Sequence, residues 1–180
     1  MTEIDILIKQ KLLGKTISTI RLFNINDDYY AFYEDSHWVF DGGIQFCIDD
    51  AIVCWGYDYE KEMMELSFDK EITDKLEGTK HYQVDSKNIK GISELQGATI
   101  KDVSIKWEFY QNIDENFEPY GDKIYAPIEI VLYFDFNMTL QLALIDFEID
   151  EQAFKMVQPT YDLEGEMLYS FNKQIKINEL

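Results

Sequence analysis

The feature of this sequence that most constrains its fold is a pair of blocks that each occur twice, in the same order. The segment Leu12–Leu22 matches Leu95–Ile105, with leucine, glycine, threonine and isoleucine identical. The segment Met64–Ile72 matches Met167–Ile175, with methionine, serine, phenylalanine, lysine and isoleucine identical. Two matches in one order predict a chain built from two related halves, because repeated sequence indicates repeated structure.

We place these halves near residues 12–75 and 95–178, within one domain that spans residues 1–180. The second half holds about twenty additional residues between its two blocks. A chain of 180 residues with 46% hydrophobic residues is long and apolar enough to form one packed core.

Each half begins in the same way. A short helix is expected to end at Gly14 or Gly97, and both glycines should have positive φ, because glycine tolerates the left-handed backbone of a helix cap. Strands rich in β-branched residues should follow, at Thr16–Phe23 and Thr99–Phe109. The residues before Gly14 fit an N-terminal helix only loosely.

The remaining elements follow from turn signals and short apolar runs. Two hairpins are predicted: Phe46–Trp55, turning at Asp49 and Asp50, and Ile128–Phe136 with Leu140–Ile149, turning at Asn137. The strands predicted to close the halves are Met64–Phe68 and Met167–Phe171. Short helices are predicted at Lys70–Leu76 and Asp150–Val157. This pattern predicts a mainly β fold, with α+β as an alternative. We expect two antiparallel halves packed face to face, after a short N-terminal helix; one continuous curved sheet is the other possibility.

The charge of the chain limits its partners and its location. With 35 acidic and 16 basic residues, the formal net charge is −19, so the surface should repel a nucleic-acid backbone. The first residues are acidic and apolar runs are short, which predicts a cytoplasmic protein outside the membrane. Cys47 and Cys54 should be reduced, because diagonal strand neighbours lie about 7–8 Å apart, too far for a disulfide.

Acidic residues are concentrated in one stretch. From Trp107 to Phe154 there are eleven acidic residues and one basic residue, Lys123. Aromatic residues are interleaved with these acids, and tyrosine and tryptophan are enriched at binding hot spots. A solvated face is the simpler interpretation. The residues that we predict to bind a partner are Glu108, Tyr110, Asp114, Glu115, Glu118, Tyr120 and Asp122.

The aromatic residues are expected to divide between the core and the surface. We assign four phenylalanines to the core: Phe46, Phe68, Phe134 and Phe136. We assign four tyrosines to the surface: Tyr57, Tyr59, Tyr110 and Tyr120.

The sequence contains no strong catalytic or cofactor motif. The Asp41-Gly42-Gly43 segment is predicted to be a turn rather than a phosphate cradle, so no cofactor is expected. A nucleophilic pair of Cys47 and His37 has no motif to support it. The alternating carboxylates of Asp146, Glu148 and Asp150 are secondary candidates for a metal site, with an exposed strand face as the simpler interpretation.

These observations favour an acidic protein-binding module that caps a basic protein. Immunity proteins, which neutralise cationic nuclease toxins, have these general properties, so we hypothesise that class. An enzyme or small-ligand-binding protein with its site between the two halves is one alternative. A DNA mimic is another. The sequence does not specify the partner or the oligomeric state.

Overall fold

The computed structural model of the chain describes residues 3–25, 32–34, 37–49, 51–58, 63–75, 82–85, 89–150, 152–153 and 155–179. Its elements, in chain order, are α1 (Glu3–Leu12), β1 (Ile17–Asn24), β2 (Phe32–Glu34), β3 (His37–Phe40), β4 (Gly42–Ile48), β5 (Ala51–Asp58), β6 (Met63–Phe68), α2 (Ile72–Lys75), β7 (Tyr82–Gln83), α3 (Ile92–Leu95), β8 (Ile100–Ile113), β9 (Pro119–Phe134), η2 (Asp135–Asn137), β10 (Thr139–Asp150), β11 (Lys155–Tyr161) and β12 (Glu166–Phe171).

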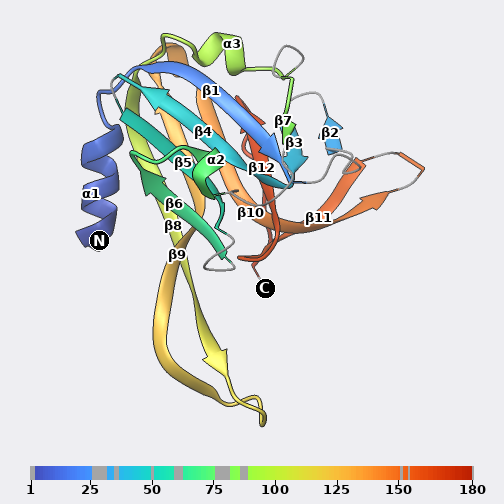
Figure 1. Cartoon of the computed structure of the whole chain (residues 1–180). Helices are drawn as coiled ribbons and strands as arrows, with labels where there is room; N and C mark the ends of the chain where they lie inside the picture. The colour runs from blue at the N-terminus through green and yellow to red at the C-terminus, as the bar shows by residue number, and fades with distance from the viewer. Residues whose placement is uncertain are drawn as a thin grey trace.

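The strands form two antiparallel sheets, which Figure 1 shows one in front of the other. The first sheet has the order β6-β5-β4-β1-β7, and the second has the order β2-β3-β12-β10-β9-β8, with β11 paired to β10. Leu22 and Trp55 of the first sheet share one buried cluster with Leu142 and Tyr169 of the second. The prediction of a mainly β domain with a short N-terminal helix is therefore confirmed, and the two sheets are separate layers.

The two first blocks meet where β1 and β8 begin. Gly14 N–H donates to the Ile100 carbonyl at 2.9 Å, and Gly97 N–H donates to the Ile17 carbonyl at 2.7 Å. The two bonds are equivalent, because Gly14 matches Gly97 and Ile17 matches Ile100 in the repeated block. Gly14 has φ 75° and Gly97 has φ 84°, which confirms the predicted helix-ending conformation.

The second blocks also occupy matching places. β6 and β12 each close a run of four strands, β6-β5-β4-β1 in one sheet and β12-β10-β9-β8 in the other. After each closing strand comes a residue with positive φ, Asp69 at 62° and Asn172 at 55°. The backbone N–H of Asp69 donates to Ile52, and that of Asn172 donates to Thr139. The origin of this symmetry by duplication remains an inference from the repeated sequence.

Most of the predicted turns and strands are present. β4 and β5 form the predicted hairpin after Asp49, while Asp50 lies outside the described residues. Cys47 faces Ile52 as expected, and Cys47 and Cys54 are free thiols. The short helix predicted over 70–76 is α2.

Two predictions are wrong. In place of the helix expected at Asp150–Val157, β10 ends at Asp150 and β11 begins at Lys155, because these strands pair and so satisfy each other's backbone groups. Residues 151 and 154 lie outside the described residues. Phe136, assigned to the core, is 88% exposed. It has φ 58° in the tight turn η2, and this turn directs its side chain out of the sandwich.

The other aromatic residues follow the prediction in part. Phe46 and Phe134 are buried, and Phe68 packs against the core while partly exposed. Tyr120 is exposed, whereas Tyr57 and Tyr110 are half-buried. Tyr59 lies outside the described residues.

Candidate partner-binding site

The outer part of the β8–β9 hairpin extends well beyond the sandwich, as Figure 1 shows. We define residues 106–125 as the arm. β8 and β9 stay paired along its length, from Lys106 opposite Glu129 to Ile113 opposite Pro119. The inner part of the hairpin contributes residues such as Val103 and Ile130 to the core, but every residue from 114 to 125 is exposed. The outer end of the arm therefore presents its side chains to solvent, whereas Trp107 at its base packs against the core.

The tip of the arm is held by Asp114. Its carboxylate accepts hydrogen bonds from the backbone N–H groups of Asn116 at 2.8 Å and Glu118 at 3.0 Å. These bonds hold the pKa of Asp114 below its ordinary value. The turn places Phe117, with φ 63°, at its apex, where its ring is 82% exposed.

Apolar side chains continue along the arm from this tip. Tyr120 is 55% exposed, Ile124 is 45% exposed and Tyr125 is 56% exposed. The rings of Phe109 and Tyr125 lie 5.8 Å apart, and the Lys123 ammonium group lies 3.6 Å from the centre of the Phe109 ring. Large apolar groups exposed together indicate an interaction surface more often than isolated ones do.

Both lysines of the arm have partners within the chain. Lys123 lies over Phe109, and Lys106 forms an ion pair with Glu179 at 2.6 Å while it stacks on Tyr161. In contrast, no lysine or arginine of the described residues lies within ion-pair distance of the acids near the tip: Glu115, Glu118 and Asp122. The exposed charge of the outer arm is therefore negative.

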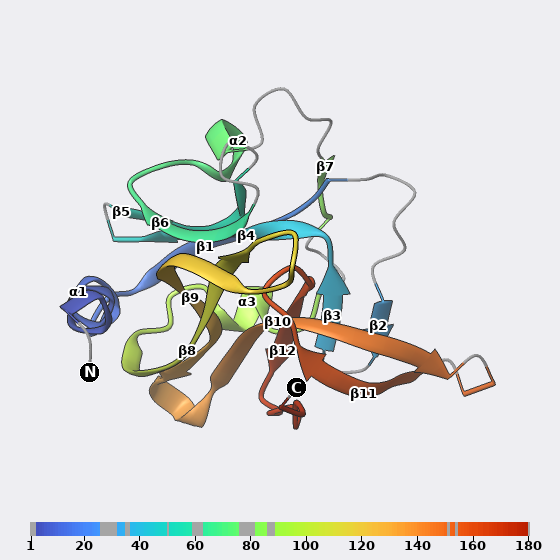
Figure 2. The ribbon, with the colours of Figure 1, turned by 90° about the horizontal axis from the view of Figure 1, so that it is seen from below.

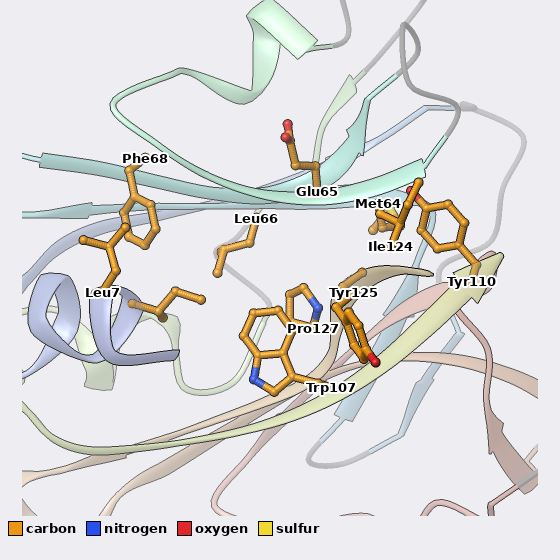
Figure 3. Close-up of a pocket in the computed structure, with 12 residues that line it drawn as sticks. Leu7, Met64, Glu65, Leu66, Phe68, Trp107, Tyr110, Ile124, Tyr125 and Pro127 are labelled. Carbon is orange, nitrogen blue, oxygen red and sulfur yellow. The ribbon is translucent and has the colours of Figure 1, made fainter. Parts of the chain in front are cut away.

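A groove runs between the base of the arm, strand β6 and helix α1. It encloses about 640 Å³ and is lined by Leu7, Ile8, Met64, Glu65, Leu66, Phe68, Trp107, Tyr110, Ile124, Tyr125, Ala126 and Pro127. Figure 3 shows Leu66 and Met64 approaching from β6, with Trp107 and Tyr125 approaching from the arm. The lining is mainly apolar, which is typical of ligand and peptide grooves.

A second hollow lies beside Tyr161 and is more polar. It encloses about 420 Å³, and its lining includes the acids Glu108, Asp162, Glu164 and Glu179. Burial and the nearby Glu129 carboxylate raise the pKa of Tyr161 above its ordinary value. Lys106 already places its ammonium group on the Tyr161 ring, at 3.6 Å from the ring centre.

All seven predicted partner-binding residues lie on the arm. Those at the outer end are exposed: Asp114, Glu115, Glu118, Tyr120 and Asp122. The other two are half-buried at the base and line different hollows, Tyr110 the groove and Glu108 the second hollow. Sequence reasoning did not select Phe117 or Ile124. A large apolar residue inside the polar turn from Asp114 to Glu118 was the available signal for Phe117.

The secondary metal candidates are not brought together as ligands. Among the described residues, no group of three or more histidine, cysteine, aspartate or glutamate side chains is placed to hold a metal ion. Asp146, Glu148 and Asp150 are exposed along β10, and Asp150 accepts backbone N–H bonds from the turn that follows. His37 lies on the same face of β3 as Val39, away from the core between the sheets, and Cys47 alternates with the core residues Phe46 and Ile48 on β4. The two side chains therefore lie on opposite outer faces of the sandwich.

Comparison with known proteins identifies no relative. No family model, curated protein or solved structure matches this chain. Within the described residues, no helix has both the length and the apolar character required to cross a membrane.

Proposed function

We propose that this protein binds a cationic protein partner through the arm and that it acts in the cytoplasm. The proposal rests on one observation: at the outer end of the arm, apolar rings are exposed together with carboxylates that form no ion pair with a described residue. Phe117 and Tyr120 are among the exposed large hydrophobic residues, in the same turn region as Glu118. Aromatic side chains provide the apolar area of binding hot spots, and surface carboxylates speed the approach of a cation-rich protein.

An immunity protein that neutralises a basic nuclease toxin is the kind of protein that we propose. A nuclease must hold phosphate groups, so its binding surface is positively charged. The net charge of −19 on this chain would attract such a surface over a distance. DNA mimicry is a weaker alternative, because exposed rings interrupt the carboxylates of the arm.

A small-ligand site in the groove is the second candidate function. Its volume of about 640 Å³ and its apolar lining support this alternative. The groove lies between β6 of the first predicted half and the arm of the second, and a site between the halves is what this alternative hypothesis expects.

Capture from the source cell, followed by binding kinetics, tests the proposed function. We expect the tagged protein to recover a basic protein, here called the captured partner, with association that slows as salt rises. Reversing Glu115, Glu118 and Asp122 to lysine should slow association mainly, since exposed charges act on encounter. Tyr120→Ala should speed dissociation by about 30-fold, the equivalent of a 2 kcal/mol hot spot.

A charge-matched control separates the arm from net charge. Reversing Asp146, Glu148 and Asp150 to lysine changes the total charge by the same amount at an exposed site away from the arm. This control should slow association much less than the arm variant. Equal slowing by the two variants, or recovery of no basic protein, contradicts the proposed function.

A further inference from the structure

The closing strand of the second sheet has its outer edge covered by strand β3. In this antiparallel pair, Phe40 lies opposite Met167, and Trp38 lies opposite Tyr169. Phe40 and Trp38 pack with the core between the sheets, whereas Val39 belongs to a cluster on the other face. β3 therefore supplies both backbone partners and two large apolar side chains to the edge of β12.

The closing strand of the first sheet has no such cover in the part of the chain that the structure describes. β6 is the end strand of its sheet and pairs with β5 on its inner side. Its residues correspond to those of β12, with Met64 matching Met167 and Leu66 matching Tyr169. An open strand edge presents backbone N–H and C=O groups that can pair with another strand.

The groove lies beside this edge. Figure 3 shows Leu66 directed into the groove and Glu65 directed away from it. Met64, two positions from Leu66, also lines the groove, as expected from the alternation of a strand. The groove is thus the counterpart of the space that Phe40 and Trp38 fill beside β12.

We infer that β6 accepts an extended segment of the partner as an additional antiparallel strand. Large apolar side chains at alternate positions of that segment enter the groove opposite Met64 and Leu66. A lysine or arginine between them faces Glu65. Backbone hydrogen bonds provide affinity in this mode of recognition, and the pockets for alternate side chains provide specificity. The inference rests on the proposed function for the partner being a cationic protein.

Charge excludes a second copy of this chain as the preferred occupant. Two β6 strands paired edge to edge would place like-charged Glu65 side chains near one another, which is destabilising. Each copy also carries a net charge of −19, so the copies repel each other. A cationic segment removes both costs.

A synthetic peptide tests the inference without the natural partner. The probe contains Trp-Lys-Phe, which copies the order of side chains in β3 with lysine in place of Val39, flanked by lysines. We expect it to bind and to slow hydrogen exchange at β6 amides. The same peptide with its backbone nitrogens methylated should lose binding, because methylation removes N–H donors. A peptide with Trp-Phe-Lys in that place has the same composition but breaks the alternation, and it should bind at least several-fold more weakly.

Protein variants locate the site of the peptide. Glu65→Lys should weaken binding of the probe about fivefold or more, in line with a cross-strand charge pair. Glu148→Lys makes the same charge change on the exposed part of β10 and should leave binding nearly unchanged. Trp107→Ala, which enlarges the groove without altering β6, should weaken the probe but leave the chain folded by circular dichroism.

The outcomes separate this inference from the proposed function. Slowed exchange at β6 that depends on Glu65 supports the strand pairing, whatever the arm variants do to the captured partner. Absence of binding, equal binding of the methylated peptide, or equal effects of Glu65→Lys and Glu148→Lys overturns it. Loss of partner binding in the arm variants alone concerns the proposed function and leaves the β6 inference in place.

Discussion

Strands β6 and β12 have closely similar sequences but different surroundings. Met64 and Met167 are both buried, at 5% and 0% exposure. Two positions later, Leu66 is half-buried on the groove, whereas Tyr169 is fully buried. β3 covers the edge of β12, and no described strand covers that of β6. The comparison teaches that the burial of side chains on two strands of similar sequence depends on whether another strand covers the outer edge.

Where the surroundings match, the local bonds match as well. The Gln45 side-chain carbonyl accepts a bond from Ile72 N–H at 3.0 Å, and that of Gln141 accepts one from Ile175 N–H at 2.7 Å. Ile72 and Ile175 are equivalent positions of the second block. The two glutamines come from strands that do not correspond: Gln45 lies on β4, whereas Gln141 lies on β10, whose counterpart in the first sheet is β5. The bond that holds the segment after each closing strand is thus kept, although the strand that supplies the accepting glutamine has changed.

The largest predicted effect compares the equivalent positions Tyr169 and Leu66. Tyr169→Ala should reduce the free energy of unfolding by about 3–5 kcal/mol, because it removes a fully buried ring. Leu66→Ala should cost about 1–2 kcal/mol, because its side chain is partly in solvent. Urea unfolding of both variants measures the difference. Equal losses of unfolding free energy in the two variants would contradict this comparison, because they would show that Leu66 is as fully buried in solution as Tyr169.

The two cap glycines should respond alike. Gly14 and Gly97 have φ of 75° and 84°, and a Cβ at either would meet no atom within 4 Å. Replacement by alanine should therefore cost about 1–2 kcal/mol at each site, through the left-handed backbone alone. Thermal unfolding of the two variants is the measurement, and a loss at only one glycine would break the equivalence of the two halves.

A smaller effect is expected at the two turn aspartates that bind the start of β1 and β8. Asp49 accepts a bond from Thr16 N–H at 3.3 Å, and Asp135 accepts one from Thr99 N–H at 3.2 Å. Asp49→Ala and Asp135→Ala should each destabilise the fold by about 1 kcal/mol. Denaturant midpoints can resolve such a change. Asp135→Ala without loss would indicate that its bond matters less than that of Asp49.

The smallest effect concerns the pH dependence of stability. Burial, with a contribution from Glu166, raises the pKa of Asp41 above its ordinary value of 3.8. Ionised Asp41 therefore costs stability at neutral pH, and this cost is relieved as pH falls through the raised pKa toward 3.8. Asp41→Asn should raise stability at neutral pH and flatten its pH dependence over that interval. An unchanged profile would contradict this account.

Local patterns were enough to predict eight of the strands, the cap glycines and the acidic stretch, but they predicted none of β2, β3, β7 and β11. Gly14 and Gly97 could be assigned because only the cap conformation requires glycine there. The pairing of β10 with β11 could not be predicted, because Asp150–Val157 lacks strand alternation and gains its partner only through the hairpin. Phe136 was misplaced for a related reason: its turn, not its hydrophobicity, determines where its ring points.

The sequence predicted the charged and aromatic residues of the candidate site, but it did not predict the groove or the open strand edge. The acids and tyrosines of the arm were identified from composition along the chain. The groove depends on contacts between α1, β6 and the arm, which are distant in sequence. The open edge of β6 depends on β3 joining the other sheet. Neither follows from a local pattern, because each is set by long-range packing.

Hydrogen exchange on the chain with and without the captured partner tests most directly whether a cationic protein binds at the arm and at β6. We predict slower exchange at residues 106–125 and 63–68, with β3 and β12 unchanged because that edge is already covered. Protection on other faces of the sandwich, with the arm and β6 unaffected, would contradict the proposed binding surface.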